Sequence, residues 1–220
     1  KYAWQQKHCS RLFEDLKKIH RDKIYSHFFG SIVSTRANEY EDDLLIIDGQ
    51  QRITTLSLLI LAGINAVKNG DMQEGDEDIN KIKEDYLYAI RRKLPRKIKL
   101  CPIEDDQKAY DALFTNNENE FINSGITSNY QLFYNLIKVS DLTFEDLIAA
   151  IEKLTIIDIC LDSRDNPQLI FESLNSCGKD LEEADKVRNY LLMSLSKDEQ
   201  ERYYHQYWSK IEKLTDGEPT

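Results

Sequence analysis

A short apolar run ends at an Asp-Gly pair, and a much longer apolar stretch begins a few residues later. Residues 44–47 read Leu-Leu-Ile-Ile, which is typical of a buried β-strand. Residues 53–67 are apolar on nearly every helical face, as expected of a buried helix. Gly49 lies between the two and allows a sharp change of chain direction. The sequence therefore predicts a strand, a tight turn and a helix in direct succession.

The turn before this helix is a candidate phosphate site. The first backbone amides of a helix have no partner in a preceding turn, and the helix dipole adds partial positive charge there. Gly49 would let a phosphate approach the backbone closely. The side chains fit the same chemistry. Arg52 could bind phosphate oxygens, and Asp48 could hold Mg²⁺ or a water. Gln50 and Gln51 could orient that water, and Thr54 and Thr55 could contribute hydroxyl contacts.

Asp-Gly is also the strongest two-residue signal for a β-hairpin, so residues 50–52 could form only a solvated turn. A hairpin should return as an alternating strand, whereas residues 56–64 are apolar on nearly every face. The pattern favours a helix after the turn. It leaves open whether the turn binds an anion.

The charge balance limits where nucleic acid could bind. The 220 residues include 29 Lys and Arg against 39 Asp and Glu, a net charge of −10. The average surface therefore repels polyanions, and DNA contact requires a local basic patch. One candidate patch consists of Arg91, Arg92, Lys93, Arg96, Lys97 and Lys99. The alternative for this run is a solvated helix end, where basic residues complement the dipole and Pro95 stops the helix.

Cysteine usage and hydropathy indicate a reduced, cytoplasmic protein without a membrane anchor. The four cysteines are widely spaced and form no Cys-x-x-Cys pair, so no zinc site is expected. No haem or flavin site is expected either. The longest apolar run, residues 56–64, is far shorter than the ~20 residues that span a bilayer.

The periodicity predicts an α+β fold, with a small mixed sheet near the N-terminus and a mostly helical remainder. Strands are expected over residues 27–34, 44–47, 97–101 and 155–161. Helices are expected over residues 5–20, 53–67, 79–93, 104–114, 130–139 and 143–154, with three more between 167 and 214. Residues 116–129 are expected to form an Asn-rich loop, and Thr143 with Asp146 a capping box.

A third polar group lies far downstream. Asp185, Arg188 and Asn189 are three and four residues apart, so they share one face of a predicted helix. Asn175 and Gly178 precede them in a turn. Taken alone, this group reads as a solvated helix flank with an Asp185–Arg188 ion pair, and Gly178 as an ordinary helix C-cap.

Several segments together resemble a known family. The string Asp48-Gly49-Gln50-Gln51-Arg52, followed by Ile-Thr-Thr-Leu, is similar to the signature of DGQQR-motif domains. These domains form the N-terminal half of GmrSD-type, modification-dependent restriction enzymes and related phage-defence proteins. Three other segments resemble family motifs in the same order: Tyr2-Ala3-Trp4, the strand over residues 27–33, and the Phe-x-x-Leu-Asn-x-x-Gly block at 171–178.

The resemblance implies a ParB/sulfiredoxin-like core over residues 1–101, truncated at its N-terminus, and a helical region over 102–220 that completes the same domain. It implies a nucleoside triphosphatase that takes an NTP with Mg²⁺ and is coupled to DNA restriction. Asp48, Gln50, Gln51 and Arg52 would be catalytic. The nucleotide would be bound by Gly49, Thr54, Thr55, Asn175, Gly178, Asp185, Arg188 and Asn189.

The partners implied are DNA, through the full-length protein, and a nuclease domain or subunit that this chain lacks. The chain could also assemble as a homo-oligomer. A second interpretation from a different class is a non-catalytic domain that senses nucleotide or DNA. A third is that this fragment is only a scaffold.

Overall fold

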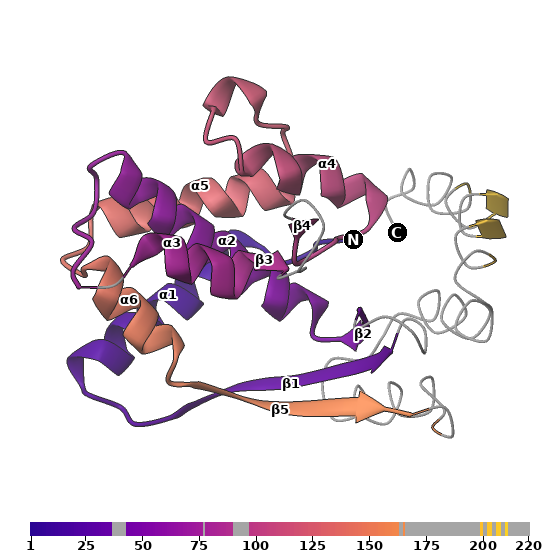
Figure 1. The fold of residues 1–220 in the computed structure, drawn as a ribbon, viewed down its shortest axis with the longest axis horizontal. Coiled ribbons are helices and arrows are strands. Elements are labelled where there is room, and N and C mark those ends of the chain that lie inside the picture. Colours follow the sequence, from indigo (N-terminus) through magenta and orange to yellow (C-terminus); the bar gives the residue numbers. More distant parts are fainter. Residues whose placement is uncertain are drawn as a thin grey trace, which may run out of the picture. The chain divides into compact units, whose positions relative to one another are not determined.

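The computed structural model describes residues 1–36, 43–76, 78–89, 97–162 and 165, together with 199, 202, 203, 206, 207 and 210. Figure 1 labels the elements, which follow one another in this order: α1 (Gln6–Arg21), β1 (His27–Arg36), β2 (Leu44–Asp48), α2 (Gln50–Lys68), α3 (Ile79–Ile82), a π-helical turn (Lys83–Leu87), β3 (Tyr88–Ala89), β4 (Lys97–Ile98), α4 (Glu104–Leu113), a 3₁₀ turn (Glu118–Glu120), α5 (Gly125–Lys138), α6 (Phe144–Ile151) and β5 (Leu154–Leu161). The predicted α+β class is confirmed.

The chain divides into two compact units. The first unit contains Lys1–Ile32 and Gly49–Ile157, and the second contains Val33–Asp48 and Asp158–Thr220. Helices α1 to α6 all belong to the first unit. The separate prediction of a core over 1–101 completed by a helical region over 102–220 stays a prediction.

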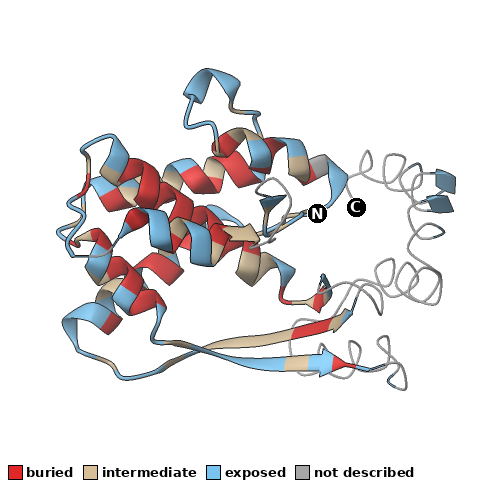
Figure 2. Ribbon diagram, viewed as in Figure 1, coloured by how far each residue is buried: buried red, intermediate tan, exposed pale blue. Residues whose placement is uncertain are grey.

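The core of the first unit forms around α2. Every residue from 54 to 66 except Leu56 is buried in this helix, because its apolar residues leave no face suited to water. It packs chiefly against α5, and α1 packs against both α5 and α6. Figure 2 shows the buried residues concentrated along α2 and on the sides of the neighbouring helices that face it. The helix predicted over 53–67 is confirmed, with three further residues at its start.

Local sequence patterns account for features of two other helices. In α1 the periodic residues Leu12, Phe13, Leu16 and Ile19 are all buried, as their spacing predicts. At the start of α6 the capping box forms: the Thr143 hydroxyl accepts from the amide of Asp146, whose carboxylate accepts from the amide of Thr143. The reciprocal bonds satisfy two amides at the helix end.

Several segments differ from their predicted structure, among them the strand predicted over 97–101, which forms only over Lys97–Ile98. The helix predicted over 79–93 ends at Leu87, because Tyr88 and Ala89 pair with Lys97 and Ile98 in a two-stranded sheet. Helix α5 begins at Gly125 instead of Tyr130, because the Ser124 hydroxyl accepts from the amide of Thr127 and caps it. The helices predicted between 167 and 214 lie outside the described residues.

The main sheet has the order β2-β1-β5. Strands β1 and β2 are antiparallel, and their register has an irregularity of the β-bulge type between Val33 and Ser34, where Val33 faces Asp48. Strand β5 runs beside β1 in the same direction (Figure 1), which makes the sheet mixed. The Ser26 and Thr155 hydroxyls, 2.6 Å apart, hydrogen-bond just before β1 and at the start of β5.

Among the described residues, Cys9 is a buried free thiol, and Cys101 and Cys160 are exposed free thiols. Cys177 lies outside the described part of the chain. None of the described helices combines the length and apolar character that crossing a bilayer requires.

Candidate functional site at the start of helix α2

Gly49 forms the turn that opens α2. Its φ angle is 95°, in the left-handed region that favours glycine, and its carbonyl accepts from the amide of Ile53 at 3.1 Å. A Cβ at this position would lie 3.0 Å from Ile32 Cγ1 and 3.1 Å from the Ser31 carbonyl oxygen. Backbone angle and space therefore both select glycine here. The chain continues as helix, so the hairpin alternative is wrong.

Arg52 is held against strand β1. One terminal nitrogen of its guanidinium donates to the carbonyl of Ser31 at 2.9 Å. Its Nε packs close to Gly30, because a Cβ at that position would lie only 2.6 Å from this nitrogen. Gly30 also has a φ angle of 125°. The structure thus places a half-buried cation one turn from Gly49, at a position that β1 determines.

Gln51 holds the N-terminal segment, residues 1–4. Its Oε1 accepts from the amides of Ala3 at 2.8 Å and Trp4 at 3.2 Å. Its Nε2 donates to the carbonyl of Lys1 at 2.9 Å. Both polar ends of this side chain therefore bond to backbone. Gln50, in contrast, is exposed in the first position of α2.

Thr54 and Thr55 are 6% and 0% exposed, so both belong to the protein interior. The Thr55 hydroxyl is 2.8 Å from the hydroxyl of Tyr2 and forms a hydrogen bond with it. This burial gives the two threonines a structural task, while their contact with a nucleotide stays a prediction.

Tyr2 is the centre of a buried hydrogen-bond network. Besides Thr55, its hydroxyl is 3.7 Å from Cys9 Sγ and accepts from Asn129 Nδ2 at 3.1 Å. Burial is the main cause that raises the pKa of the Tyr2 hydroxyl far above its ordinary value, so the group stays neutral. Burial likewise raises the pKa of the Cys9 thiol.

Two residues far along the chain fix the same segment. Asn129 Nδ2 also donates to the Trp4 carbonyl at 2.7 Å, and a carboxylate oxygen of Asp106 accepts from the Tyr2 amide. Sequence reasoning missed Asn129 and Asp106, because their separation from Tyr2 by more than 100 positions gives no local pattern. The N-terminal segment thus bonds to α2, α4 and α5, all within the first unit.

Asp48 ends β2 and belongs to the second unit. Its partner across the sheet is Val33, at the irregularity in the β1–β2 register. Bulges of this kind often lie beside functional sites, where they change the direction of a side chain. Within the part of the chain that the structure describes, no three His, Cys, Asp or Glu side chains gather in a group suited to a metal ion.

The remaining predicted site residues are mostly not covered. Asn175, Gly178, Asp185, Arg188 and Asn189 lie outside the described residues, as do Arg91, Arg92, Lys93 and Arg96. Two members of the basic run are described: Lys97 is exposed in β4, and Lys99 Nζ donates to the Asp85 carbonyl at 2.7 Å.

Fold and site together define an α+β domain, largely helical, that carries an Asp-Gly-Gln-Gln-Arg turn at the start of its central buried helix. The family model described as the GmrSD restriction endonuclease, N-terminal domain, matches residues 1–192. The chain therefore belongs to this family, and the resemblance inferred from its motifs is confirmed. No curated protein matches the chain in sequence.

Proposed function

We propose that this chain is the nucleotide-binding and NTP-hydrolysing module of a modification-dependent DNA restriction protein. The observation that carries the proposal is the construction of the DGQQR turn in a member of this family. Gly49 adopts a left-handed turn directly before α2, and Arg52 is anchored beside it by Ser31. The nuclease that cuts DNA would be a separate domain or subunit.

The turn has the elements that phosphoryl transfer requires. Catalysis of this reaction consists mainly of positioning and of stabilising negative charge on the transferred group. A helix N-terminus provides amides and a positive dipole end, and a guanidinium matches the geometry of phosphate oxygens. In the proposal, Gly49 and the start of α2 bind the phosphates, and Arg52 stabilises the developing charge.

The bound nucleotide would bring Mg²⁺ with it. Proteins often hold this ion through one or two carboxylates together with substrate phosphates, so the single carboxylate of Asp48 fits that role. The ion would neutralise charge on the phosphates. Gln50 would orient the attacking water. Gln51 would act chiefly as a positioning residue, because its polar atoms bond to residues 1–4.

The other proposed contacts keep the roles that the sequence suggests. Asn175, Gly178, Asp185, Arg188 and Asn189 would also contact the nucleotide, as the family resemblance implies. Thr54 and Thr55 would support the first turn of α2 from the interior. The basic run from Arg91 to Lys99 would contact DNA phosphates.

Substitution of Arg52 tests the proposal. In Arg52→Ala, phosphate release from an NTP with Mg²⁺ should fall about 100- to 1,000-fold. Removal of the bond to Ser31 should cost about 1 kcal/mol, which lowers Tm by about 2–4 °C. Arg52→Lys keeps the charge but loses the planar guanidinium. Its phosphate release should therefore lie between that of the wild type and that of Arg52→Ala. Full phosphate release by a folded Arg52→Ala variant would refute the proposal.

A second function is a domain that senses nucleotide or DNA without catalysis. The burial of Thr54 and Thr55 and the backbone bonds of Gln51 favour it, since these residues then have structural tasks. Thermal shift and phosphate release, measured on the same sample with each NTP and Mg²⁺, separate the two functions. Stabilisation without turnover identifies the sensor.

A further inference from the structure

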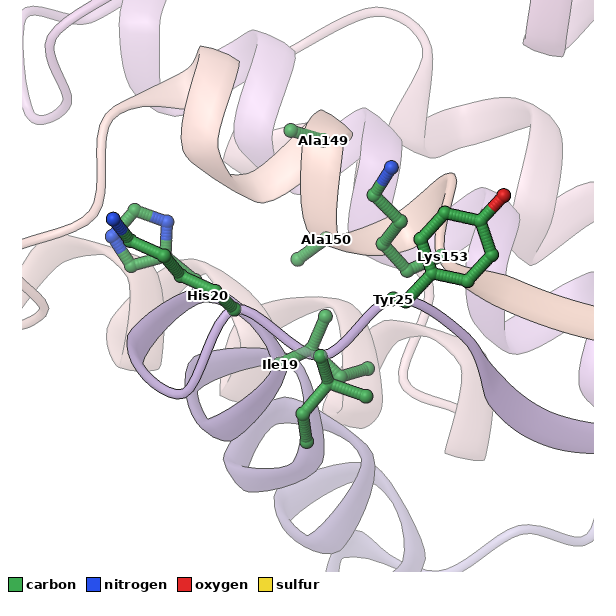
Figure 3. Close-up of a pocket in the computed structure, with 8 residues that line it drawn as sticks. Ile19, His20, Tyr25, Ala149, Ala150 and Lys153 are labelled. Atoms are coloured by element: carbon green, nitrogen blue, oxygen red, sulfur yellow. The ribbon is translucent and has the colours of Figure 1, made fainter.

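A pocket of about 320 Å³ lies where α1 and α6 end, well separated in sequence from the DGQQR motif. All of its lining residues belong to the first unit. Ile19, Ile24, Ala149 and Ala150 give it an apolar lining, and His20, Lys23, Tyr25 and Lys153 supply its polar groups. Figure 3 shows His20 at one end and the Tyr25 ring beside Lys153 at the other.

The pocket is basic in an otherwise acidic chain. Its lining includes two lysines and a histidine but no carboxylate, whereas the whole chain has a net charge of −10. Outside the lining, Asp146 Oδ1 lies 3.5 Å from His20 Nδ1, so the excess of cations at the pocket comes from Lys23 and Lys153. Such a local excess of cations attracts an anionic ligand.

The backbone places Lys23 at the pocket at an energetic cost. Its φ angle is 51°, a left-handed conformation that a glycine would adopt without strain. Helix α1 ends there in a Schellman motif, in which the amide of Ile24 donates to the carbonyl of Ile19 at 3.0 Å. The motif usually has glycine at the position of Lys23. The strained backbone at Lys23 is consistent with a role for its side chain at the pocket.

Tyr25 is an aromatic surface open to solvent. It is 89% exposed, the highest value among the large apolar and aromatic residues on the described surface. The ammonium group of Lys153 lies 5.8 Å from the centre of its ring. An exposed aromatic ring beside a cation is the combination with which proteins hold single-stranded nucleic acid, because the base stacks on the ring and the cation contacts the backbone.

We propose that this pocket binds one nucleotide of a DNA strand, with the base stacked on Tyr25 and the phosphate contacted by Lys23 and Lys153. The inference rests on the proposed role of the chain in DNA restriction. It does not depend on NTP hydrolysis, because none of the lining residues belongs to the DGQQR turn. It also differs from the basic run at residues 91–99.

Fluorescence anisotropy with a short labelled oligodeoxythymidine and the whole chain tests the proposal. Tyr25→Ala should weaken binding roughly 5- to 100-fold, and Tyr25→Phe, which keeps the ring, should restore it. Lys23→Ala/Lys153→Ala should weaken binding and reduce the slope of log affinity against log salt by about 0.7 for each phosphate that the protein no longer neutralises. Tyr25 and both lysines are exposed, so these variants should fold.

The matched control is Lys7→Ala/Lys108→Ala, which removes the same charge from exposed positions on α1 and α4 outside the pocket. It should bind the oligonucleotide like the wild type. An equal loss in this control, or wild-type affinity in both pocket variants, overturns the proposal. So does complete competition by free thymidine monophosphate at the concentration of the oligonucleotide, which would make the pocket a site for free nucleotides.

Basic residues near helix C-termini can also serve only to complement the dipole. In that case the lysine variants lower Tm but bind DNA normally, which again overturns the proposal. Phosphate release, measured on the same variants, should stay at the wild-type level. A wild-type chain that releases phosphate but does not bind the oligonucleotide would reject this site and leave the proposed hydrolysis intact. Loss of phosphate release in Arg52→Ala with unchanged oligonucleotide binding would concern the DGQQR motif alone.

Discussion

At the scale of single residues, two glycines determine where Arg52 lies. Gly49 makes the turn into α2, and Gly30 leaves room on β1 for the guanidinium. Each has a positive φ angle, and each would bring a Cβ within 3.0 Å of another atom. Arg52 can therefore take this position because neither Gly30 nor Gly49 carries a side chain.

Gly30→Ala should displace Arg52 without removing it. The added Cβ would lie 2.6 Å from Arg52 Nε, and alanine is strained at a φ of 125°. We expect a loss of about 1–3 kcal/mol in stability and reduced phosphate release. Thermal denaturation of the single and double variants measures the coupling: in an Arg52→Ala background the clash is gone, so Gly30→Ala should cost less. Equal costs in both backgrounds would contradict this arrangement.

Gln51→Ala should release the N-terminal segment, because it removes three hydrogen bonds to backbone. We expect a cost of about 1–2 kcal/mol and loss of hydrogen-exchange protection at the amides of Ala3 and Trp4. Gln51→Glu keeps the acceptor and should retain most of that protection. If the two amides exchange equally fast in wild type and Gln51→Ala, Gln51 does not hold the segment.

At the scale of elements, helix ends follow local chemistry where a cap is present. Thr143 and Asp146 form a reciprocal box at the start of α6, and the pattern of these two residues was sufficient to predict it. Ser124 caps α5 in a similar way, but the Gly-Ile-Thr-Ser-Asn sequence that follows has weak helix propensity. Packing of Ile126 and Tyr130 into the core makes that turn helical.

Thr143→Ala should destabilise the start of α6 by about 1 kcal/mol, because the amide of Asp146 loses its acceptor. Thr143→Ser retains a hydroxyl and should recover most of the loss. The midpoint of urea unfolding, at unchanged slope, measures both effects. An unaffected midpoint in Thr143→Ala would show that tertiary packing alone defines this helix end.

At the scale of the whole molecule, one carboxylate links helices that are far apart in sequence. Asp71 follows α2, accepts from the hydroxyl of Tyr134 at 2.6 Å and pairs with Lys138 Nζ at 2.9 Å, both on α5. These bonds, first that of Tyr134 and then that of Lys138, lower the pKa of Asp71 below its ordinary value. The ionised form is therefore favoured in the folded state.

This shift makes part of the stability depend on pH. Because the folded pKa of Asp71 is depressed, its contribution is present above the unfolded pKa of about 4 and is lost as pH falls through the folded value. Asp71→Asn should be less stable than wild type at neutral pH, and the difference should shrink on acidification below about pH 4. Urea unfolding across this range tests the prediction. A difference that stays constant with pH would contradict it.

The sequence by itself determined much of this protein. Hydrophobic periodicity placed α1, α2, β1, β2 and β5, because burial of an apolar face depends on local spacing. The motif string and its order along the chain identified the family, which the match over residues 1–192 confirms. The roles of individual residues in the candidate site stay predictions from that resemblance.

Only the tertiary structure decided which polar side chains from distant positions bond to one another. It bonded Gln51 to residues 1–4, buried Thr55 against Tyr2, and brought Asn129 and Asp106 to the same segment. It also placed Lys153 beside Tyr25, although 128 positions separate them (153 − 25). Contacts between distant positions depend on how helices pack, and no local pattern of residues encodes that arrangement.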